Sequence, residues 1–237
     1  MKQRPIIFNT EMVRAILDGR KTQTRRPINP QPNPDTETSK GGYWFPCAAF
    51  QSMVHVEDFK NPLCRGMASD ACPICSVGDQ LWVRETWYQK GHYCMPMWDS
   101  TEYEDAFWSG TNQAKYFASD RIEKVSHKFG EYFWRKRPSI HMPRWAARII
   151  LEVTDIRVER LNDISEQDAI KEGCNAIEGC KWHTFEEADR GIPMHDHTAK
   201  DAFWAKWESI YGYQSWQSNP WVWVIEFKVI STTGGAA

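Results

Sequence analysis

A lysine and a threonine lie three positions apart in a short basic segment near the start of the chain. The segment reads Arg20-Lys21-Thr22-Gln23-Thr24-Arg25-Arg26 and follows Gly19. A Thr hydroxyl is a weak nucleophile near neutral pH unless a base accepts its proton, and a Lys can be that base when burial lowers its pKa. Arg supplies a fixed fork of donors for a phosphate, a carboxylate or a carbonyl oxygen. The segment predicts either a nucleophilic site at Lys21 and Thr24, with Arg26 holding the substrate, or a solvated basic turn.

A second group of candidate residues combines basic and aromatic side chains. In His141-Met142-Pro143-Arg144-Trp145, Arg144 can hold an anion and Trp145 offers a stacking face next to His141. Basic and aromatic residues also alternate in Trp134-Arg135-Lys136-Arg137, a composition that suits single-stranded nucleotides. We expect these arginines and Arg148 to face the same side as Lys21. The alternative is that Trp145 belongs to the core and Arg144 pairs with an acid.

Cysteine spacing suggests one structural metal site. Cys72-Pro73-Ile74-Cys75 is a CxxC motif, Cys64 lies eight positions before it, and Cys47 and His55 lie further upstream. Three Cys with a fourth Cys or a His can hold a tetrahedral zinc ion, which would stabilise an irregular segment. The alternative is that all of these cysteines are free thiols. His195-Asp196-His197 is a looser group that suits either a metal ion or a polar loop.

Composition limits the class of protein. The chain has 237 residues, 29 Lys and Arg against 31 Asp and Glu, and a net charge of −2. This charge excludes a globally basic nucleic-acid-binding protein but allows a local basic patch. Seven Cys is an odd number, which excludes complete disulfide pairing within the chain. The longest strongly apolar run, over residues 221–225, is far shorter than the roughly 20 residues of a membrane-spanning helix. We expect a cytoplasmic protein with no membrane partner.

Hydrophobic periodicity and turn residues predict the order of the elements. We expect one domain over residues 1–230, with insertions at about 27–77 and 88–137 and a flexible tail at 231–237. The expected elements are a strand at 6–8, a helix capped by Thr10, a strand at 81–87, a strand at 148–161 that bends near Asp155, helices opened by the capping boxes Ser165–Asp168 and Thr198–Asp201, and a strand at 221–230. Because strands are not regularly followed by helices, a doubly wound parallel sheet does not fit. The order predicts an α+β fold, a small and mostly antiparallel β-barrel with helices at its rim.

Several motifs of the sequence resemble the ASCH domain family. The segment from Ile16 to Arg26 is similar to the family pattern of a helix followed by Gly-x-Lys-x-x-Thr or Glu and then Arg. It resembles in particular the small bacterial ASCH proteins that hydrolyse N(4)-acetylcytidine. Their later helix with a Glu is matched by Asp168-Ala169-Ile170-Lys171-Glu172-Gly173, and their final strand by Val224-Ile225-Glu226-Phe227-Lys228. Three further segments are typical of a larger, phage- and prophage-associated branch of the family: Gly78–Thr86, Ser139–Trp145 and Ser218–Val224.

The resemblance implies a PUA-like fold and an amidohydrolase activity on a modified nucleoside or nucleotide. Thr24 would be the nucleophile, Lys21 its base, and Glu172 the group that orients Lys21 or shuttles the proton, with no cofactor required. Glu172 also follows a short expected helix, where the helix dipole disfavours a carboxylate, so we expect either a functional role or a cationic partner. One alternative is a non-catalytic module that binds RNA or a modified base. Another alternative is a ribonuclease.

Overall fold

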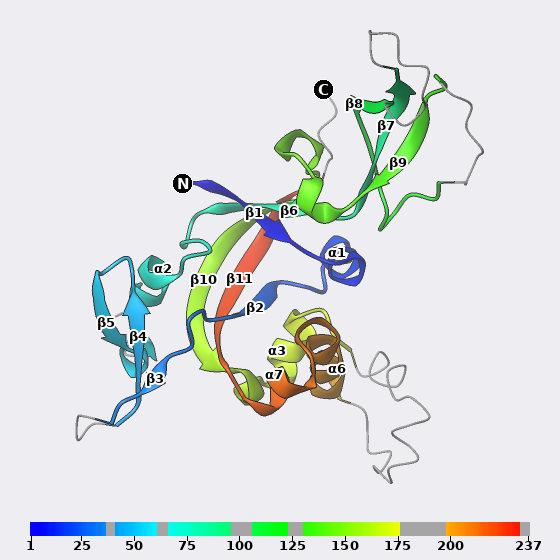
Figure 1. Cartoon of the computed structure of the whole chain (residues 1–237). Coiled ribbons are helices and arrows are strands. Elements are labelled where there is room, and N and C mark those ends of the chain that lie inside the picture. The colour runs from blue at the N-terminus through cyan, green and yellow to red at the C-terminus, as the bar shows by residue number, and fades with distance from the viewer. Residues whose placement is uncertain (37–40, 61–65, 96–105, 123–129, 176–197, 233–237) are drawn as a thin grey trace.

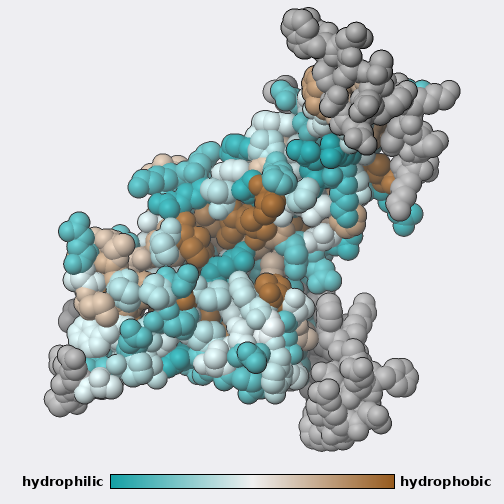
Figure 2. All heavy atoms as spheres, viewed as in Figure 1, coloured by the Kyte–Doolittle hydropathy of each residue, from teal (hydrophilic) through white to brown (hydrophobic). Residues whose placement is uncertain are grey.

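The computed structural model describes residues 1–36, 41–60, 66–95, 106–122, 130–175 and 198–232 (Figure 1). The fold is α+β, as expected, with most strands gathered in three sheets and few helices. The largest sheet has five strands, and it occupies the middle of the molecule. Figure 2 shows hydrophobic residues concentrated around this middle region, with hydrophilic residues on either side.

The five-stranded sheet brings together segments from both ends of the chain. Its order is β1 (Gln3–Ile7), β6 (Gln80–Arg84), β10 (Ile150–Arg160), β11 (Trp221–Ser231) and β2 (Gln23–Pro27). Only β1 and β6 are parallel, and the other neighbours are antiparallel. The expectation that the segments near 6–8, 81–87, 148–160 and 221–230 pack together is therefore confirmed.

The predicted closed barrel is wrong, because no ladder of backbone hydrogen bonds joins the two edge strands β1 and β2 within the described residues. Side chains bridge this gap instead. Arg26 Nη2 donates to the carbonyl oxygen of Ile7 at 2.7 Å, and the Arg26 guanidinium carbon lies 5.5 Å from the centre of the Phe8 ring. We call this gap between β1 and β2 the seam.

Helix α1 (Thr10–Leu17) connects β1 to β2 and covers the core next to the seam (Figure 1). Its N-cap is Asn9, whose side chain accepts from the Met12 amide, so the prediction of Thr10 as the cap was wrong by one position. Asn is as good a cap as Thr, and Thr10 takes up the first helical position instead. The buried side of α1 consists of Met12, Val13, Ala15 and Ile16, which follows the expected helical spacing.

The long strands β10 and β11 form the centre of the sheet and separate two hydrophobic clusters. The expected bend of β10 is confirmed by an irregular register between Val153 and Asp155. Along β11 the side chains alternate, since Trp223 and Ile225 belong to the main core whereas Val222 and Val224 face the second cluster. The second cluster lies against α3 (Glu166–Lys171), α6 (Ala199–Tyr211) and α7 (Tyr213–Gln217), and 3₁₀ turn η6 (Leu161–Asp163) precedes α3.

Both predicted helix starts are confirmed. Ser165 accepts from the Asp168 amide at the start of α3, and Thr198 and Asp201 form a reciprocal capping box at the start of α6. Such caps satisfy amide groups that have no partner inside the helix. Within the described ranges, no helix combines the length and the apolar composition needed to cross a membrane.

Two smaller sheets lie in the ranges expected to be insertions. The first contains β3 (Asn33–Pro34), β4 (Tyr43–Cys47) and β5 (Ser52–His55), followed by η1 (Val56–Lys60) and α2 (Met67–Ala71). The second contains β7 (Trp87–Cys94), β8 (Phe107–Tyr116) and β9 (Phe133–Arg137), followed by η4 (Ser139–His141) and η5 (Arg144–Ala146). Both expected insertions thus contain strands.

Candidate functional site

The main chain of Lys21 is held where two helices end. The amides of Arg20 and Lys21 both donate to the Ala15 carbonyl at the end of α1, at 2.9 and 3.0 Å. Lys21 also forms an isolated β-bridge with Glu172, the C-cap of α3, and the Thr22 amide donates to the Lys171 carbonyl at 2.8 Å. The ends of α1 and α3 therefore fix the position from which the Lys21 side chain starts.

The side chains of Lys21 and Glu172 form a buried ion pair. Lys21 Nζ lies 2.5 Å from Glu172 Oε2, and the two residues are 0% and 2% exposed. Lys21 Nζ also donates to the carbonyl oxygens of Gln23 at 2.8 Å and of Glu172 at 3.0 Å. These three acceptors match the three donors of an ammonium group. Lys21 is thus the cationic partner that we expected for Glu172 at the end of a helix.

Burial lowers the pKa of Lys21 below its ordinary value of 10.5. The positive charge of Lys206 lowers this pKa further, whereas the charge of Glu172 raises it, and the effect of burial is the largest. Lys206 is itself buried on α6, with its Nζ 3.8 Å from Cys174 Sγ. The pair therefore holds a lysine that releases its proton more readily than a lysine in water.

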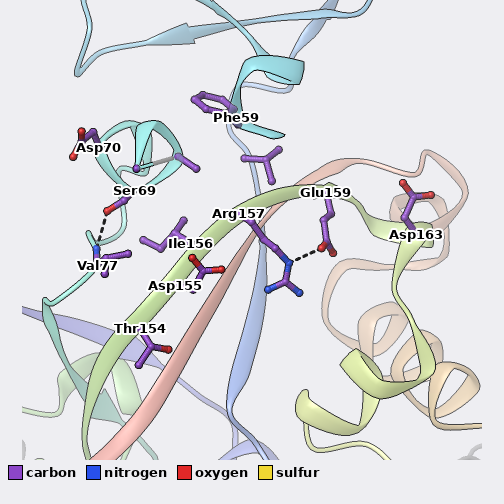
Figure 3. Close-up of a pocket in the computed structure, with 13 residues that line it drawn as sticks. Phe59, Ser69, Asp70, Val77, Thr154, Asp155, Ile156, Arg157, Glu159 and Asp163 are labelled. Carbon is purple, nitrogen blue, oxygen red and sulfur yellow. Dashed lines mark hydrogen bonds and ion pairs between the residues drawn. The ribbon is translucent and has the colours of Figure 1, made fainter. Parts of the chain in front are cut away.

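A chain of alternating charges leads away from this pair across the sheet. Arg25 Nη1 lies 3.4 Å from Glu172 Oε1, and Arg25 Nη2 lies 3.0 Å from Glu159 Oε2. Glu159 Oε1 in turn lies 2.5 Å from Arg157 Nε, the contact drawn in Figure 3. Arg157 also reaches Glu226 at 2.6 Å and Asp168 at 3.4 Å.

The chain of charges ends at a cavity of about 1040 Å³ that runs along β10. All six residues from Thr154 to Glu159 line it, together with residues of η1, α2 and η6 (Figure 3). Its charged lining consists of one arginine and four acids: Arg157, Asp70, Asp155, Glu159 and Asp163. The cavity therefore disfavours a phosphate group. Lys21, Thr24 and Glu172 are not part of its lining.

Thr24 lies in β2, opposite Ile225 of β11, and is 1% exposed. Its side chain shares the main-core face of the sheet with Ile225, whereas Arg25 points to the other face, toward Glu172. The hydrogen bonds of the Lys21 ammonium all go to Gln23 and Glu172, so none joins it to Thr24. The Phe8 ring contacts both Lys21 and Arg26, the residue two positions after Thr24. Its centre lies 5.7 Å from Lys21 Nζ and 5.5 Å from the Arg26 guanidinium carbon.

Comparison with protein-family models, with curated proteins and with solved structures finds no match for this chain. The resemblance to the ASCH family, and the fold and activity that it implies, therefore stay predictions. The geometry shows that Lys21 and Glu172 meet and that both side chains and that of Thr24 are closed off from solvent, whereas Thr24 lies on the other face of β2 from Arg25 and is not hydrogen-bonded to Lys21.

The second group of candidate residues lies away from Lys21. Arg144 Nε donates to Gln3 at the start of β1, whereas Arg26 bonds to Ile7 at its end. Trp145 is partly buried and packs edge-on against Trp87, with ring centres 5.6 Å apart, whereas the partner of Arg144 is not the acid that the core alternative required. His141 is exposed at the end of η4, and no contact in the described residues links it to Lys21.

Arg148 is not available for nucleic acid, contrary to expectation. Its guanidinium makes two hydrogen bonds to the Glu85 carboxylate, at 2.9 and 3.0 Å, and it lies 4.0 Å from the centre of the Tyr116 ring. Both members of this ion pair are buried. Burial also raises the pKa of Glu85, which Arg148 opposes. The contact with Tyr116 of β8 links this pair, at the ends of β6 and β10, to the β7–β8–β9 sheet.

The cysteines do not form a complete metal site within the described residues. No three potential ligands come together there, so Cys47 and His55 do not complete a group with Cys72 and Cys75. Cys64 and the His195-Asp196-His197 group lie outside the described residues, and zinc stays a prediction. A hydrogen bond from Cys75 lowers the pKa of the Cys72 thiol to about 7, and the same bond raises the pKa of Cys75.

Sequence reasoning missed three of the charged residues in the network around the pair: Arg157, Glu159 and Asp168. The spacing of such residues along a strand could have shown which of them share a face. Arg157 and Glu159 stand two apart in the strongest predicted strand, so both were bound to lie on one face. Gln23 and Arg25 also stand two apart. The segment from Gln23 to Pro27 was too polar to be identified as a strand, so this spacing did not place them on one face.

Gly173 holds the end of α3 against Lys21, and we expect an alanine there to be destabilising. Gly173 has φ +84°, and an added Cβ would lie 2.7 Å from Ala15 Cβ and 3.1 Å from Lys21 Cβ. Gly19, with φ +73°, is a matched control because an added Cβ meets nothing within 4 Å. In urea unfolding, Gly19→Ala should cost about 1–2 kcal/mol for the left-handed backbone alone. Gly173→Ala should cost about 1–3 kcal/mol more. Equal losses would contradict this close packing.

Proposed function

We propose that the chain is a hydrolase that cleaves the amide of a modified nucleoside of the N(4)-acetylcytidine type. The observation that carries the proposal is the fully buried Lys21, with a lowered pKa, held against Glu172 three residues before Thr24. A lysine whose pKa is lowered by burial is neutral at lower pH than a lysine in water, and only a neutral lysine can accept a proton. The sequence motif that contains Lys21, Thr24 and Arg26 supports the same reaction.

The reaction has two steps in this proposal. The first step requires the open site to bring Lys21 Nζ to the Thr24 hydroxyl in place of the Gln23 carbonyl, its acceptor in the closed structure. Thr24 Oγ then attacks the amide carbonyl carbon while neutral Lys21 takes the hydroxyl proton and Glu172 holds Lys21 in place. Arg26 stabilises the carbonyl oxygen as it gains negative charge. The C–N bond then breaks, Lys21 returns its proton to the leaving nitrogen, and the acyl group remains on Thr24. Water hydrolyses this ester, which releases the acid and regenerates Thr24.

Substrate entry requires the seam between β1 and β2 to open. Lys21 and Thr24 are 0% and 1% exposed, and the Phe8 ring beside Lys21 is itself 2% exposed. The outer part of the cover is Arg26, which is only half-buried and bonds to a single carbonyl oxygen, that of Ile7. A substrate oxygen that replaces this carbonyl as the Arg26 partner would release β1 from β2.

The proposal is tested by incubating the full chain with N(4)-acetylcytidine and a panel of other acylated nucleosides. Chromatography should detect the free nucleoside and the carboxylic acid in equal amounts. If no compound of the panel is cleaved, the hydrolase proposal is wrong. In that case, binding of modified RNA without turnover favours the non-catalytic module, and cleavage of the RNA backbone favours the ribonuclease.

The proposed role of Lys21 predicts the pH dependence of the reaction. Activity needs neutral Lys21, so kcat/KM should rise with pH and level off below 10.5, the ordinary lysine value. Lys206→Met removes a charge that lowers the pKa of Lys21, so this pKa should rise and the rising limb should move to higher pH. Lys171→Gln is the control, because the Lys171 side chain is 49% exposed. The rising limb of its pH profile should stay where it is in the wild type. Identical profiles for wild type and Lys206→Met would contradict Lys21 as the base.

A further inference from the structure

The β7–β8–β9 sheet carries basic and aromatic side chains on its outer face. Directly paired residues of neighbouring strands share a face, and the register pairs Tyr88 with both Lys115 and Lys136, and Lys90 with Trp134. We call this set, with Phe117 and Tyr132, the basic–aromatic face. The alternation of each strand thus divides the Trp134–Arg137 run between two faces.

Contacts within the basic–aromatic face join five of its members: Tyr88, Lys115, Phe117, Trp134 and Lys136. Lys115 Nζ lies 4.9 Å from the centre of the Trp134 ring, and Lys136 Nζ lies 4.0 Å from the centre of the Phe117 ring. The rings of Tyr88 and Phe117 are 6.2 Å apart. Lysine ammonium groups therefore sit over aromatic rings, where each ammonium still has donors to offer to an anion.

The opposite face of the same sheet is partly covered by the rest of the protein. Trp87 packs there against Trp145 of η5, and both belong to a small hydrophobic cluster. Arg135 lies over the rings of Trp108 and Tyr93, at 5.4 and 5.6 Å. These two faces differ in their surroundings although they share the same strands.

The charge of this sheet contrasts with that of the chain. Strands β7, β8 and β9 contain five Lys or Arg residues and no Asp or Glu, whereas the chain has a net charge of −2. Two aromatic residues at the margins of the face are exposed, Tyr132 at 58% and Phe117 at 38%. The face thus offers rings for stacking and a positive potential in one place.

We propose that the basic–aromatic face binds single-stranded nucleic acid. Bases of a single strand stack on Tyr132, Trp134 and Phe117, and its phosphates contact the ammonium groups of Lys115 and Lys136. A duplex hides the faces of its bases and can use only the lysines. The site is separate from Lys21, Thr24 and Glu172, so this proposal does not depend on the proposed hydrolase.

Two double variants of the full chain test the proposal by removing equal charge from opposite faces of one sheet. Lys115→Gln/Lys136→Gln alters the basic–aromatic face, and Arg135→Gln/Arg137→Gln alters the opposite face. The probe is a fluorescein-labelled 12-nucleotide RNA of mixed sequence without self-complementarity, followed by fluorescence anisotropy over a range of salt concentrations. Circular dichroism and thermal unfolding establish that each variant is folded.

The lysine variant should weaken binding about tenfold and reduce the slope of log affinity against log salt by about 1.4, which is roughly 0.7 for each lost phosphate contact. The arginine variant should keep the wild-type slope. Tyr132→Ala, which changes no charge, should weaken binding about fivefold through lost stacking.

Three results would overturn the proposal: no binding by the wild-type chain, equal losses in the two double variants, or equal affinity for the single strand and for its duplex. If one double variant fails to fold, Tyr132→Ala and the duplex comparison still decide the outcome.

Discussion

The variant Glu172→Gln should lose about 3–5 kcal/mol of its free energy of unfolding, the usual cost of removing one partner from a buried ion pair. Glu172 is 2% exposed and is the carboxylate that faces both Lys21, at 2.5 Å, and Arg25, at 3.4 Å. Without its charge, Lys21 keeps only carbonyl oxygens as partners in a buried environment. Urea unfolding followed by tryptophan fluorescence measures the loss.

Two further variants make this result specific. Glu226→Gln removes a carboxylate from the outer end of the same network, where the side chain is 29% exposed, and should cost about 1 kcal/mol or less. Lys21→Met should cost less than Glu172→Gln, because Glu172 then retains Arg25 as a partner. If Glu172→Gln and Glu226→Gln cost the same, Glu172 does not compensate the buried charges.

The parts of the fold that sequence predicted are those determined by neighbouring residues. The caps at Ser165 and Thr198 depend on a side chain and an amide three positions apart, so their residue types suffice. Strand β11 begins with the continuous apolar run of a strand buried on both faces, as Val222, Trp223 and Val224 illustrate. Strand β10 alternates instead between buried and more exposed positions. Elements of this kind do not depend on knowing which segment lies opposite.

The parts that sequence could not predict depend on distant partners. Strand β2 consists of Gln23, Thr24, Arg25, Arg26 and Pro27, and has little hydrophobic pattern of its own. It is a strand because β11 pairs with it and because acids from β10 and α3 neutralise Arg25. The absence of barrel closure likewise depends on how the seam is filled by Phe8 and Arg26, which no local pattern records.

The candidate site was predicted in the same uneven way. The motif gave Lys21 and Glu172 as partners, and their 2.5 Å contact agrees with it. It did not give the burial of the whole site, because exposure is decided by the packing of α1, α3 and the seam around Lys21. Arg148 shows the reverse error, since its residue type suggested an anion site whereas Glu85 occupies it fully.

The variant Thr24→Ala should abolish turnover of the acylated nucleoside while the chain remains folded. Removing a nucleophile that acts together with its base costs on the order of 10⁴-fold or more in kcat. The stability cost should be about 1 kcal/mol, because the side chain is small and Ala also fits a strand facing the core. Thr24→Ser keeps a hydroxyl at the same position and should retain measurable activity.

Thr22→Ala is the matched control for Thr24→Ala. Thr22 stands two positions earlier and is exposed, and its described hydrogen bonds, to Lys171 and Phe227, are made by the main chain. It should therefore keep wild-type turnover. Intact-mass spectrometry after rapid acid quenching should detect an acyl group on the wild-type chain and none on Thr24→Ala. Full activity of Thr24→Ala would show that Thr24 is not the nucleophile, and Lys21 would then have to activate a water molecule for direct attack on the amide.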